Sequence, residues 1–287
     1  MAADDLTDRA TVRRLLLEAG VRPSKRLGQN FLVDTVVIDA IASAAAKEAP
    51  RRVIEIGAGL GAVTRALARL SPEVVAIELD RRLADALEQA VAGFDSVSVW
   101  QGDVLDYGLE ASGDGETIVV GSLPYASTAA ILQYLVAHRG AISAAILLTQ
   151  REVAEKIAAS PGPSGSALGV LVRAYGDVEI HRAVGRGSFH PVPGVDSLLW
   201  EIRFLDRPRF EAESATFFAV VRAVYGLRRK MLRVALRSLA SREAVARALK
   251  QAGIEGTDRG ETLDFDALDR LSRAFEGVET LSGTEKT

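Results

Sequence analysis

The segment VIEIGAGLGAVTRAL places three glycines, Gly57, Gly59 and Gly61, between an apolar run and a helical pattern. Glycine lets a backbone approach a ligand closely and supplies φ angles that other residues avoid, while the first turn of the following helix offers free N–H groups. Such a loop after a strand typically cradles a nucleotide or a nucleoside. Close packing alone is a weaker explanation for three glycines in this context.

Two acidic residues follow later apolar runs, where a nucleoside cofactor needs hydrogen-bond acceptors. Glu78 ends the run in VVAIELD, where a carboxylate can accept from ribose hydroxyls. Asp103, in WQGDVLDY, can accept from an adenine amino group, or it can cap a turn or helix. Glu55, just before the glycine loop, favours S-adenosylmethionine. The glycine spacing with Ala62 also fits the dinucleotide fingerprint loosely, so a nicotinamide oxidoreductase stays open as an alternative.

A further apolar run leads into Ser122-Leu123-Pro124-Tyr125, which has the form Asn/Asp/Ser-x-Pro-aromatic. This pattern is typical of enzymes that methylate amino groups. The exocyclic amine of adenine is a poor nucleophile because its lone pair is delocalised into the ring. In such a motif a side-chain oxygen and a backbone carbonyl accept the two amine hydrogens, proline holds the turn rigid, and the aromatic ring stacks on a base taken out of its helix.

These segments need a scaffold that brings them together. Short β-rich runs alternate with helical patterns, which indicates an α/β fold with a doubly wound, mostly parallel sheet. Because carboxyl ends of parallel strands meet at one edge, the glycine loop, Glu78, Asp103 and Ser122 should share one cleft. The predicted strands are Val53–Ile56, Val74–Glu78, Val97–Trp100, Ile118–Gly121, Ala145–Thr149, Val170–Tyr175 and Val195–Phe204, and helices are expected at Thr11–Ala19, Val63–Leu70 and Leu83–Val91.

After Asp206 no β-rich run appears, and helical patterns cover Ala215–Tyr225, Arg229–Leu239, Arg242–Ala252 and Phe265–Phe275. This change predicts a small all-helical C-terminal domain. The expected organisation is an N-terminal helix and basic loop over 1–30, a cofactor-binding domain over 31–205, the helical domain over 206–278 and a disordered tail over 279–287.

Composition narrows the class of protein. The chain has 287 residues, 48% of them hydrophobic and 25% charged, which is ordinary for a soluble enzyme. No run approaches the roughly 18 apolar residues of a membrane span, and the start MAADDLTDRA does not resemble a targeting peptide, so a cytoplasmic protein is expected. The absence of cysteine excludes disulfides and thiolate chemistry, and three scattered histidines suggest no metal site.

The net charge of −3 does not indicate a nucleic-acid binder, but basic residues gather in one segment. Between Arg222 and Lys250 the only acidic residue is Glu243. Charge alone favours a solvated helix face and an RNA contact about equally. The basic residues of this segment are Arg222, Arg228, Arg229, Lys230, Arg233, Arg237, Arg242, Arg247 and Lys250.

From about Thr11 to Phe275 the chain resembles the bacterial small-subunit ribosomal RNA adenine dimethyltransferases. The segments that carry the resemblance are SKRLGQNFLVD, VIEIGAGLGAVT, VVAIELDRRL, QGDVLDY, GSLPYAST, QREVAEKIAASPG, GSFHPVPGVDS and RRKMLR. LGQNFLVD, ELDRRL and the P-x-P-x-V-D-S segment are the specific ones. The resemblance implies a Rossmann-like methyltransferase domain, S-adenosylmethionine as methyl donor and no metal. It implies as substrate two adjacent adenines near the 3′ end of 16S rRNA, each dimethylated at N6, in an immature small subunit, and a monomeric enzyme.

The resemblance also assigns roles residue by residue. Ser122 occupies the position of the family's amine-binding asparagine, next to the Leu123 carbonyl and Pro124. Tyr125 is expected to stack on the target adenine, with Phe189 on its other face. The implied cofactor-binding residues are Asn30, Leu32, Gly57, Gly59, Glu78, Asp103 and Ser122. The implied RNA-binding residues are Lys25, Arg26, Arg222, Arg228, Arg229, Lys230 and Arg233, with Arg228 to Lys230 opening a C-terminal helix.

This chain departs from the family pattern on the expected substrate side. Serine replaces asparagine at 122, Ala126 replaces an asparagine, Gly194 replaces a lysine, and Ser166–Leu171 reads SALGVL. Serine is a shorter acceptor than asparagine. The replacement leaves open an RNA-binding assembly factor with weak or no catalysis. A 23S rRNA adenine methyltransferase is a further alternative, because its motif also continues from Pro-aromatic into Ser-Thr.

Overall fold

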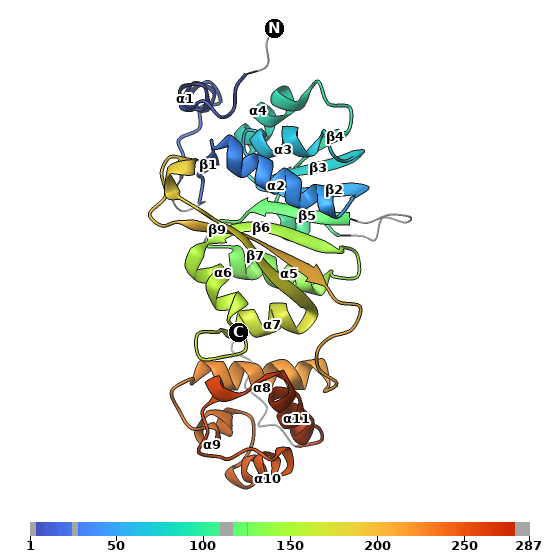
Figure 1. The fold of residues 1–287 in the computed structure, drawn as a ribbon, viewed down its shortest axis with the longest axis vertical. Helices are drawn as coiled ribbons and strands as arrows, with labels where there is room; N and C mark the ends of the chain where they lie inside the picture. Colours follow the sequence, from blue (N-terminus) through green and yellow to red (C-terminus); the bar gives the residue numbers. More distant parts are fainter. Residues whose placement is uncertain (1–3, 25–27, 110–116, 125, 279–287) are drawn as a thin grey trace. The chain divides into compact units, whose positions relative to one another are not determined.

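The computed structural model describes residues 4–24, 28–109, 117–124 and 126–278 of the chain (Figure 1). Within these ranges no helix is long and apolar enough to cross a membrane. Three of the candidate site residues lie outside the described residues: Lys25, Arg26 and Tyr125.

The chain divides into two compact units according to the contacts inside each. Unit 1 consists of residues 1–154 and 177–204, and unit 2 of residues 155–176 and 205–287. Residues 155–176, which the sequence pattern places in the α/β domain, therefore group with the C-terminal helices. The domain limits 31–205 and 206–278, and the roles assigned to the domains, stay predictions.

In its described residues unit 1 holds a seven-stranded sheet with the order β4-β3-β2-β5-β6-β9-β7 (Figure 1). Neighbouring strands from β4 to β6 are parallel, whereas β9 is antiparallel to β6. The predicted α/β class with a mostly parallel sheet is confirmed. The strands are β2 (Arg52–Ile56), β3 (Glu73–Glu78), β4 (Val97–Gln101), β5 (Thr117–Ser122), β6 (Ala144–Gln150), β7 (Gly176–Val184) and β9 (Ser197–Phe204).

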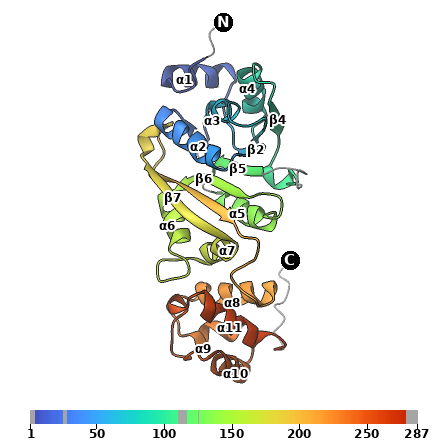
Figure 2. The same ribbon diagram turned by 45° about the vertical axis from the view of Figure 1, so that its right-hand side comes forward.

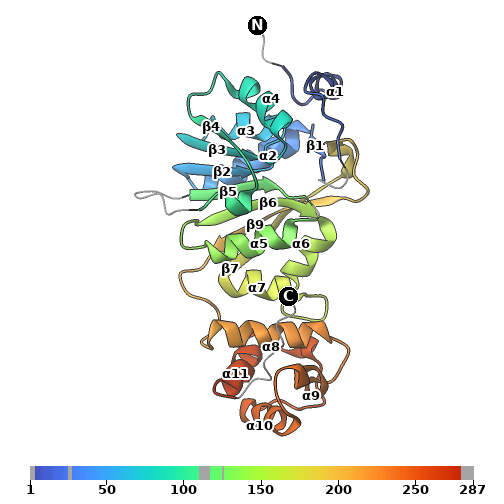
Figure 3. The ribbon, with the colours of Figure 1, turned by 180° about the vertical axis from the view of Figure 1, so that it is seen from behind.

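Helices cover both faces of the sheet in unit 1: α2 and α3 lie on one face and α5 on the other (Figures 1 and 3). Helix α2 begins after Asp34, whose carboxylate accepts hydrogen bonds from the N–H groups of Val36 and Val37. The helices of this unit are α1 (Arg9–Glu18), α2 (Thr35–Lys47), α3 (Ala62–Leu67), α4 (Arg81–Val91), η1 (Val104–Asp106), α5 (Thr128–Ala137), α6 (Arg151–Ala158, which ends in unit 2) and η2 (Arg186–Ser188).

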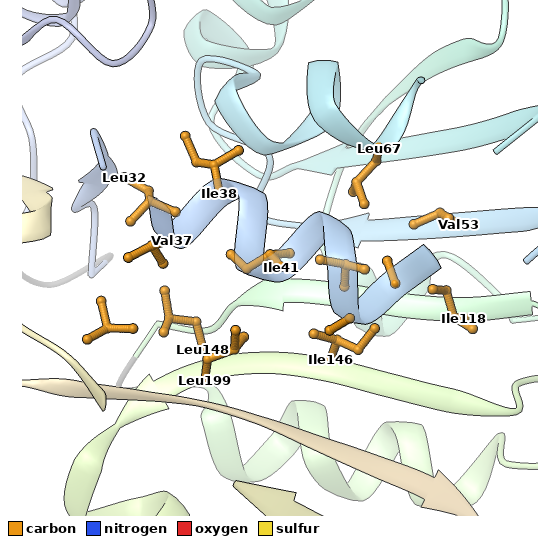
Figure 4. Close-up of a cluster of buried hydrophobic side chains, with 14 of the residues drawn as sticks. Leu32, Val37, Ile38, Ile41, Val53, Leu67, Ile118, Ile146, Leu148 and Leu199 are labelled. Atoms are coloured by element: carbon orange, nitrogen blue, oxygen red, sulfur yellow. The ribbon is translucent and has the colours of Figure 1, made fainter. Parts of the chain in front are cut away.

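A buried cluster joins α2 to the middle of the sheet (Figure 4). Ile41 on α2 packs among Val53 of β2, Ile118 of β5 and Ile146 of β6. Burying branched aliphatic side chains is the main favourable contribution to such a core, about 1.5–3 kcal/mol for each residue. The cluster holds rigid the strands whose ends carry the candidate site.

A short pairing links two segments far apart in the sequence. Strand β1 (Phe31–Leu32) runs antiparallel to β8 (Phe189–His190), with Phe31 opposite His190 and Leu32 opposite Phe189. The Ser188 hydroxyl also donates a hydrogen bond to the Asp34 carboxylate at 2.7 Å. LGQNFLVD and GSFHPVP, two of the segments that carry the family resemblance, are therefore neighbours in space.

Unit 2 contains α7 and the helices that follow β9 (Figure 2). The rings of Phe210 and Phe217 stack with centroids 4.0 Å apart, and Asp269 accepts hydrogen bonds from the N–H groups of Glu211 and Ala212, both at 2.8 Å. The helices are α7 (Ala167–Tyr175), α8 (Ser214–Gly226), α9 (Leu232–Ala235), η3 (Leu236–Ser238), α10 (Arg242–Ala252), η4 (Gly260–Thr262) and α11 (Phe265–Phe275).

Two predictions about secondary structure are wrong, one of a strand and one of a helix. Val170–Tyr175, expected as a strand, belongs to α7, because the Ser166 hydroxyl caps that helix by accepting from the Gly169 N–H at 3.0 Å. Its valines read as strand formers, but Val170 and Val172 are buried helical residues. The missed strand is β7, which lies at the edge of the sheet, mixes polar with apolar residues and is buried only at its two ends.

The basic run Arg228 to Lys230 does not open a helix. Helix α8 ends at Gly226, and these residues form the turn before α9, which begins only at Leu232. Helix α9 gives way to the 3₁₀ turn η3 at Leu236, so the long helix expected over Arg229–Leu239 is replaced by two short pieces.

Candidate cofactor pocket and catalytic site

One pocket lies inside unit 1 at the carboxyl ends of the parallel strands, with a cavity of about 200 Å³. It is lined by the ends of β2 to β5, the glycine loop and the segment before β1. Among the predicted catalytic and cofactor-binding residues, those that line it are Asn30, Leu32, Gly57, Gly59, Glu78, Asp103, Ser122 and Pro124.

The glycine loop needs glycine for steric reasons at two positions. Gly59 has φ of +59°, and a Cβ there would lie 3.2 Å from the ring of Phe31. Gly61 has φ of +89°, and a Cβ there would lie 2.8 Å from a methyl group of Leu87. Both φ angles lie in the left-handed region, which residues with a Cβ rarely adopt. The glycines of GAGLG are therefore needed for the turn of the backbone from β2 into α3.

Glu78, at the end of β3, is 6% exposed and binds the glycine loop directly. Its carboxylate accepts hydrogen bonds from the N–H of Gly59 and the N–H of Asp80, both at 2.9 Å. Burial raises the pKa of Glu78, and the two backbone N–H groups oppose that shift. The carboxylate is therefore held in place at the pocket wall before any ligand binds.

Glu55, one residue before the end of β2, also lines the pocket and is 4% exposed. Burial raises the pKa of Glu55 to about 7; the Thr64 hydroxyl opposes the shift and the charge of Glu78 adds to it. In the described part of the chain, its Oε2 has no hydrogen-bond partner. The sequence drew attention to Glu55 only as a cofactor marker; its burial could not be seen there.

Asp103, after β4, caps a turn and also lines the pocket, so both roles that the sequence left open are compatible with the structure. One carboxylate oxygen caps η1 by accepting from the N–H of Leu105 at 3.0 Å. The residue is nevertheless exposed and lines the pocket. A turn cap can thus also present its second oxygen to a ligand.

The segment after β5 is held by the start of α5. The Pro124 carbonyl accepts from the N–H of Thr128 at 3.0 Å and from the Thr128 hydroxyl at 2.8 Å. Leu123 is buried, and its N–H donates to the Leu148 carbonyl at 2.9 Å. Ser122 is exposed, and within the described residues its hydroxyl has no hydrogen-bond partner. Leu123 and Pro124 are thus held in place, while the Ser122 side chain is available to a ligand.

The end of β5 lies directly beside the glycine loop. Ile56 is opposite Gly121 in the parallel β2–β5 pair, and a Cβ on Gly57 would lie 3.6 Å from the Ser122 carbonyl oxygen. The candidate catalytic segment and the candidate cofactor loop therefore form adjoining parts of one wall.

Asn30 and Phe189 differ in their relation to the pocket. Asn30 lines it and donates from its side-chain amide to the Gly28 carbonyl at 3.1 Å. Phe189 is 3% exposed, packs in the core cluster with Leu32 and is not part of the pocket lining. Stacking of Phe189 on a base stays a prediction, and it would require this segment to move.

The basic residues of unit 2 are not equivalent. Arg222, Arg229, Lys230 and Arg233 are exposed and, in the portion of the chain that is described, have no ion pair or hydrogen bond from the side chain. The Arg228 guanidinium instead donates to the Pro163 carbonyl. Arg228 thus stabilises the loop 159–166, whereas the side chains of Arg229 and Lys230 are free to contact RNA in the described part of the chain.

The pocket fits a nucleoside with a charged tail. It offers a close-approach glycine loop, carboxylates at the ends of two adjacent strands and an apolar lining from Leu32, Ala58 and Val104. No group of three or more His, Asp or Glu side chains that could hold a metal is found among the described residues. A methyl-transfer motif beside such a pocket defines a methyltransferase of the S-adenosylmethionine-dependent α/β class.

The sequence matches the family "Ribosomal RNA adenine dimethylase" over residues 21–273, and the chain belongs to that family. It is 39% identical over 275 residues to "Ribosomal RNA small subunit methyltransferase A" of Moorella thermoacetica, covering 91% of this chain and 96% of that protein. The protein of the same name from Thermobifida fusca is 37% identical over 270 residues, covering 92% and 94%.

Solved structures agree with the fold. The crystal structure of the 23S rRNA methyltransferase ErmE has a TM-score of 0.66 and 28% identity, covering 86% of this chain and 100% of that chain. A dimethyladenosine transferase from Plasmodium falciparum has a TM-score of 0.74 at 21% identity, covering 86% and 98%. The expected family, methyltransferase activity and cofactor S-adenosylmethionine are confirmed.

Proposed function

We propose that this protein transfers methyl groups from S-adenosylmethionine to the N6 amines of two adjacent adenines near the 3′ end of 16S rRNA. The observation that carries the proposal is the contact between the Ser122 segment and the glycine loop on one pocket wall. The similarity to small-subunit methyltransferases over nearly the whole chain supports the choice of RNA. The reaction would take place in the cytoplasm, on an immature small subunit, with the enzyme acting as a monomer.

The cofactor supplies an electrophilic methyl group. On the protein side, Glu78 would accept from the ribose hydroxyls, Asp103 from the adenine amine, and Asn30 and Leu32 would contact the methionine end. Glu78 and Asp103 extend from the ends of adjacent strands, and both line the pocket. These residues bind and orient the donor, and the rigid sheet keeps them in register.

The Ser122 hydroxyl and the Leu123 carbonyl would accept the two hydrogens of the target amine. Holding the amine in this way directs the nitrogen lone pair at the methyl carbon. The Pro124 carbonyl is already bonded to Thr128, so Pro124 is held in place before the base arrives. No base has to remove a proton first, because the amine becomes acidic only after it gains the methyl group. Catalysis would thus come from positioning and hydrogen-bond acceptance.

A binding factor with little catalysis is the second candidate, and Ser122 is the observation that favours it. Serine reaches less far than asparagine, and losing one transition-state hydrogen bond commonly costs about 10²–10³ in rate. Incubation with labelled S-adenosylmethionine and undermethylated 30S particles separates the two functions. Label in N6-methylated adenine supports the enzyme, whereas bound particles without label support the binding factor.

The 23S rRNA alternative rests on the similarity to ErmE. That similarity is 28% identity, below the 39% identity to the small-subunit methyltransferase of Moorella thermoacetica. Mass spectrometry of rRNA from cells with and without the gene would identify the modified base. Loss of dimethyladenosine from 23S rRNA alone would overturn the proposed substrate.

A further inference from the structure

A second basic surface lies on unit 1, where α1, β1 and the segment around β8 are side by side (Figures 1 and 3). Arg9 of α1 donates hydrogen bonds to the carbonyls of Phe189, at 3.0 Å, and Gly187. Arg9 therefore ties the N-terminal helix to the β8 segment. None of the basic residues that the resemblance assigns to RNA binding lies in α1 or beside β8.

Arg13 lies one helical turn beyond Arg9, on the same side of α1. The positive charges of Arg13 and Arg9 help to lower the pKa of His190, after burial as the main cause, which places both arginines near β8. Arg13 is exposed, and among the described residues its side chain has no ion pair or hydrogen bond.

Two further arginines extend this surface along the chain that leads into β8. Arg186 is exposed and, over the described ranges, its guanidinium has no partner; Arg182 makes only a long hydrogen bond of 3.4 Å to the Val36 carbonyl. We name Arg9, Arg13, Arg182 and Arg186 the α1–β8 basic surface.

The acids beside this surface are already engaged. Asp34 caps α2 and accepts from the Ser188 hydroxyl, which lowers its pKa. Asp8 caps α1 through the Thr11 N–H, and Asp196 accepts from the backbone N–H of Arg186 at 3.0 Å. Arg13 and Arg186 are exposed and have no carboxylate partner among the residues that the structure describes. Such guanidinium groups are a recognition element for phosphate oxygens.

The surface adjoins the mouth of the pocket. Phe31 and Leu32, which pair with His190 and Phe189, both line the pocket. Apolar side chains are exposed nearby, with Leu17 of α1 75% and Val192 after β8 56% exposed. Arginines next to exposed apolar groups suit a nucleic-acid strand, which alternates phosphates with apolar base faces.

We propose that the α1–β8 basic surface binds the phosphate backbone of the substrate RNA next to the target base, with Arg13 and Arg186 making the phosphate contacts. Arg9 is a positioning residue that holds α1 on β8. The inference rests on the proposed function, and it adds a contact beside the pocket to the RNA-binding residues that the family resemblance implies, which are Lys25 and Arg26 in unit 1 and the basic residues of unit 2. An acidic protein partner would use the same charges, but membership of an rRNA-modifying family favours RNA.

The test uses the full chain and an RNA oligonucleotide that spans the 3′ end of 16S rRNA. The variants are Arg13→Gln, Arg186→Gln and the double variant. The matched control is Lys47→Gln, since Lys47 is exposed, lies in the last turn of α2 at the other end of that helix from Asp34, and has no side-chain partner in the described segments. RNA affinity is measured between about 50 and 200 mM salt, and S-adenosylmethionine affinity is measured alongside it.

We expect the double variant to bind RNA roughly tenfold more weakly and to lower the slope of log K against log salt by about 1.4–1.8, because each phosphate contact contributes about 0.7–0.9. Each single variant should show about half of the slope change. Cofactor affinity should stay the same, because neither arginine lines the pocket. Lys47→Gln should behave like the wild type.

An RNA affinity and salt slope of the double variant equal to those of the wild type would overturn the inference. If the wild type methylates 30S particles under the same conditions, that result leaves the proposed function intact. A wild type that neither binds the RNA nor methylates the particles would overturn both. Binding of an acidic peptide in preference to RNA would overturn the assignment of the partner.

Discussion

The Glu78 carboxylate accepts a hydrogen bond from the backbone N–H of Gly59 at 2.9 Å. This bond joins the end of β3 to the glycine loop that follows β2. A strand end and a loop that would each contact a different part of a nucleoside are thus locked together. The bond also explains why the acid can be buried: it satisfies one of its oxygens, and Asp80 satisfies the other.

Glu78→Gln should weaken S-adenosylmethionine binding by roughly 10- to 100-fold, because hydrogen bonds to a charged acceptor are worth about 1.5–3 kcal/mol. The variant should also lose some stability, because the glutamine NH₂ group cannot accept the hydrogen bond that the N–H of Gly59 or of Asp80 donates to the carboxylate. Calorimetric titration gives the affinity and thermal unfolding the stability. The matched control is Glu73→Gln at the exposed start of the same strand, which should leave affinity unchanged. Equal affinity of Glu78→Gln and wild type would contradict the assigned role.

Glu55 should make stability fall as pH rises from about 4.5 to about 7. Its pKa is about 7 in the folded chain against an ordinary value of 4.5, so the folded state holds a proton that the unfolded state has lost. The stability is fully present below the ordinary pKa and is lost as pH rises through the folded pKa. A shift of this size corresponds to about 3 kcal/mol.

Glu55→Gln removes that contribution. The free energy of unfolding of the variant should therefore rise relative to that of the wild type as the pH increases from 5 to 8. Urea unfolding at each pH measures the difference. Glu73→Gln serves as the exposed control and should keep the wild-type pH profile. Parallel profiles for Glu55→Gln and wild type would show that the carboxyl group is not buried as a neutral acid.

Ser122→Asn should leave cofactor affinity nearly unchanged and keep or raise the methylation rate. The side chain is exposed and, in the described region, has no partner that the larger amide would displace. Ser122→Ala is the matched comparison and should lower kcat by roughly 10²–10³, because the amine loses its side-chain acceptor. Label transfer to 30S particles under single-turnover conditions measures both. A large loss of rate in Ser122→Asn would indicate that the site has been rebuilt around serine.

The strand ends that form the pocket could be predicted because their signals are local. Gly57 to Gly61 and Glu78 follow apolar runs that can only be buried strands, and parallel strands bring their carboxyl ends together. The elements that depend on distant neighbours could not be predicted. Strand β7 lacks a continuous apolar run because it lies at the exposed edge of the sheet. The valines of α7 are helical because a serine cap and packing outweigh β propensity.

The same limit applies to individual site residues. The charge of Arg228 is visible in the sequence, but its bond to the Pro163 carbonyl depends on how a loop 65 positions earlier is folded. The burial of Glu55 could not be predicted either, because an acidic residue at the end of an apolar run has the same sequence pattern whether it is exposed or buried.

Arg229 and Arg228 should therefore differ when each is changed to glutamine. Arg229 is exposed, so Arg229→Gln should lower the slope of log K for RNA against log salt by about 0.7–0.9 and leave thermal stability unchanged. Arg228→Gln should instead lower thermal stability, because the loop that contains Pro163 loses its brace, with a smaller effect on the slope. Filter binding at several salt concentrations and thermal unfolding of the same samples provide both readouts. An equal loss of slope in the two variants, with no change in stability, would mean that Arg228 leaves Pro163 to bind phosphate in the complex.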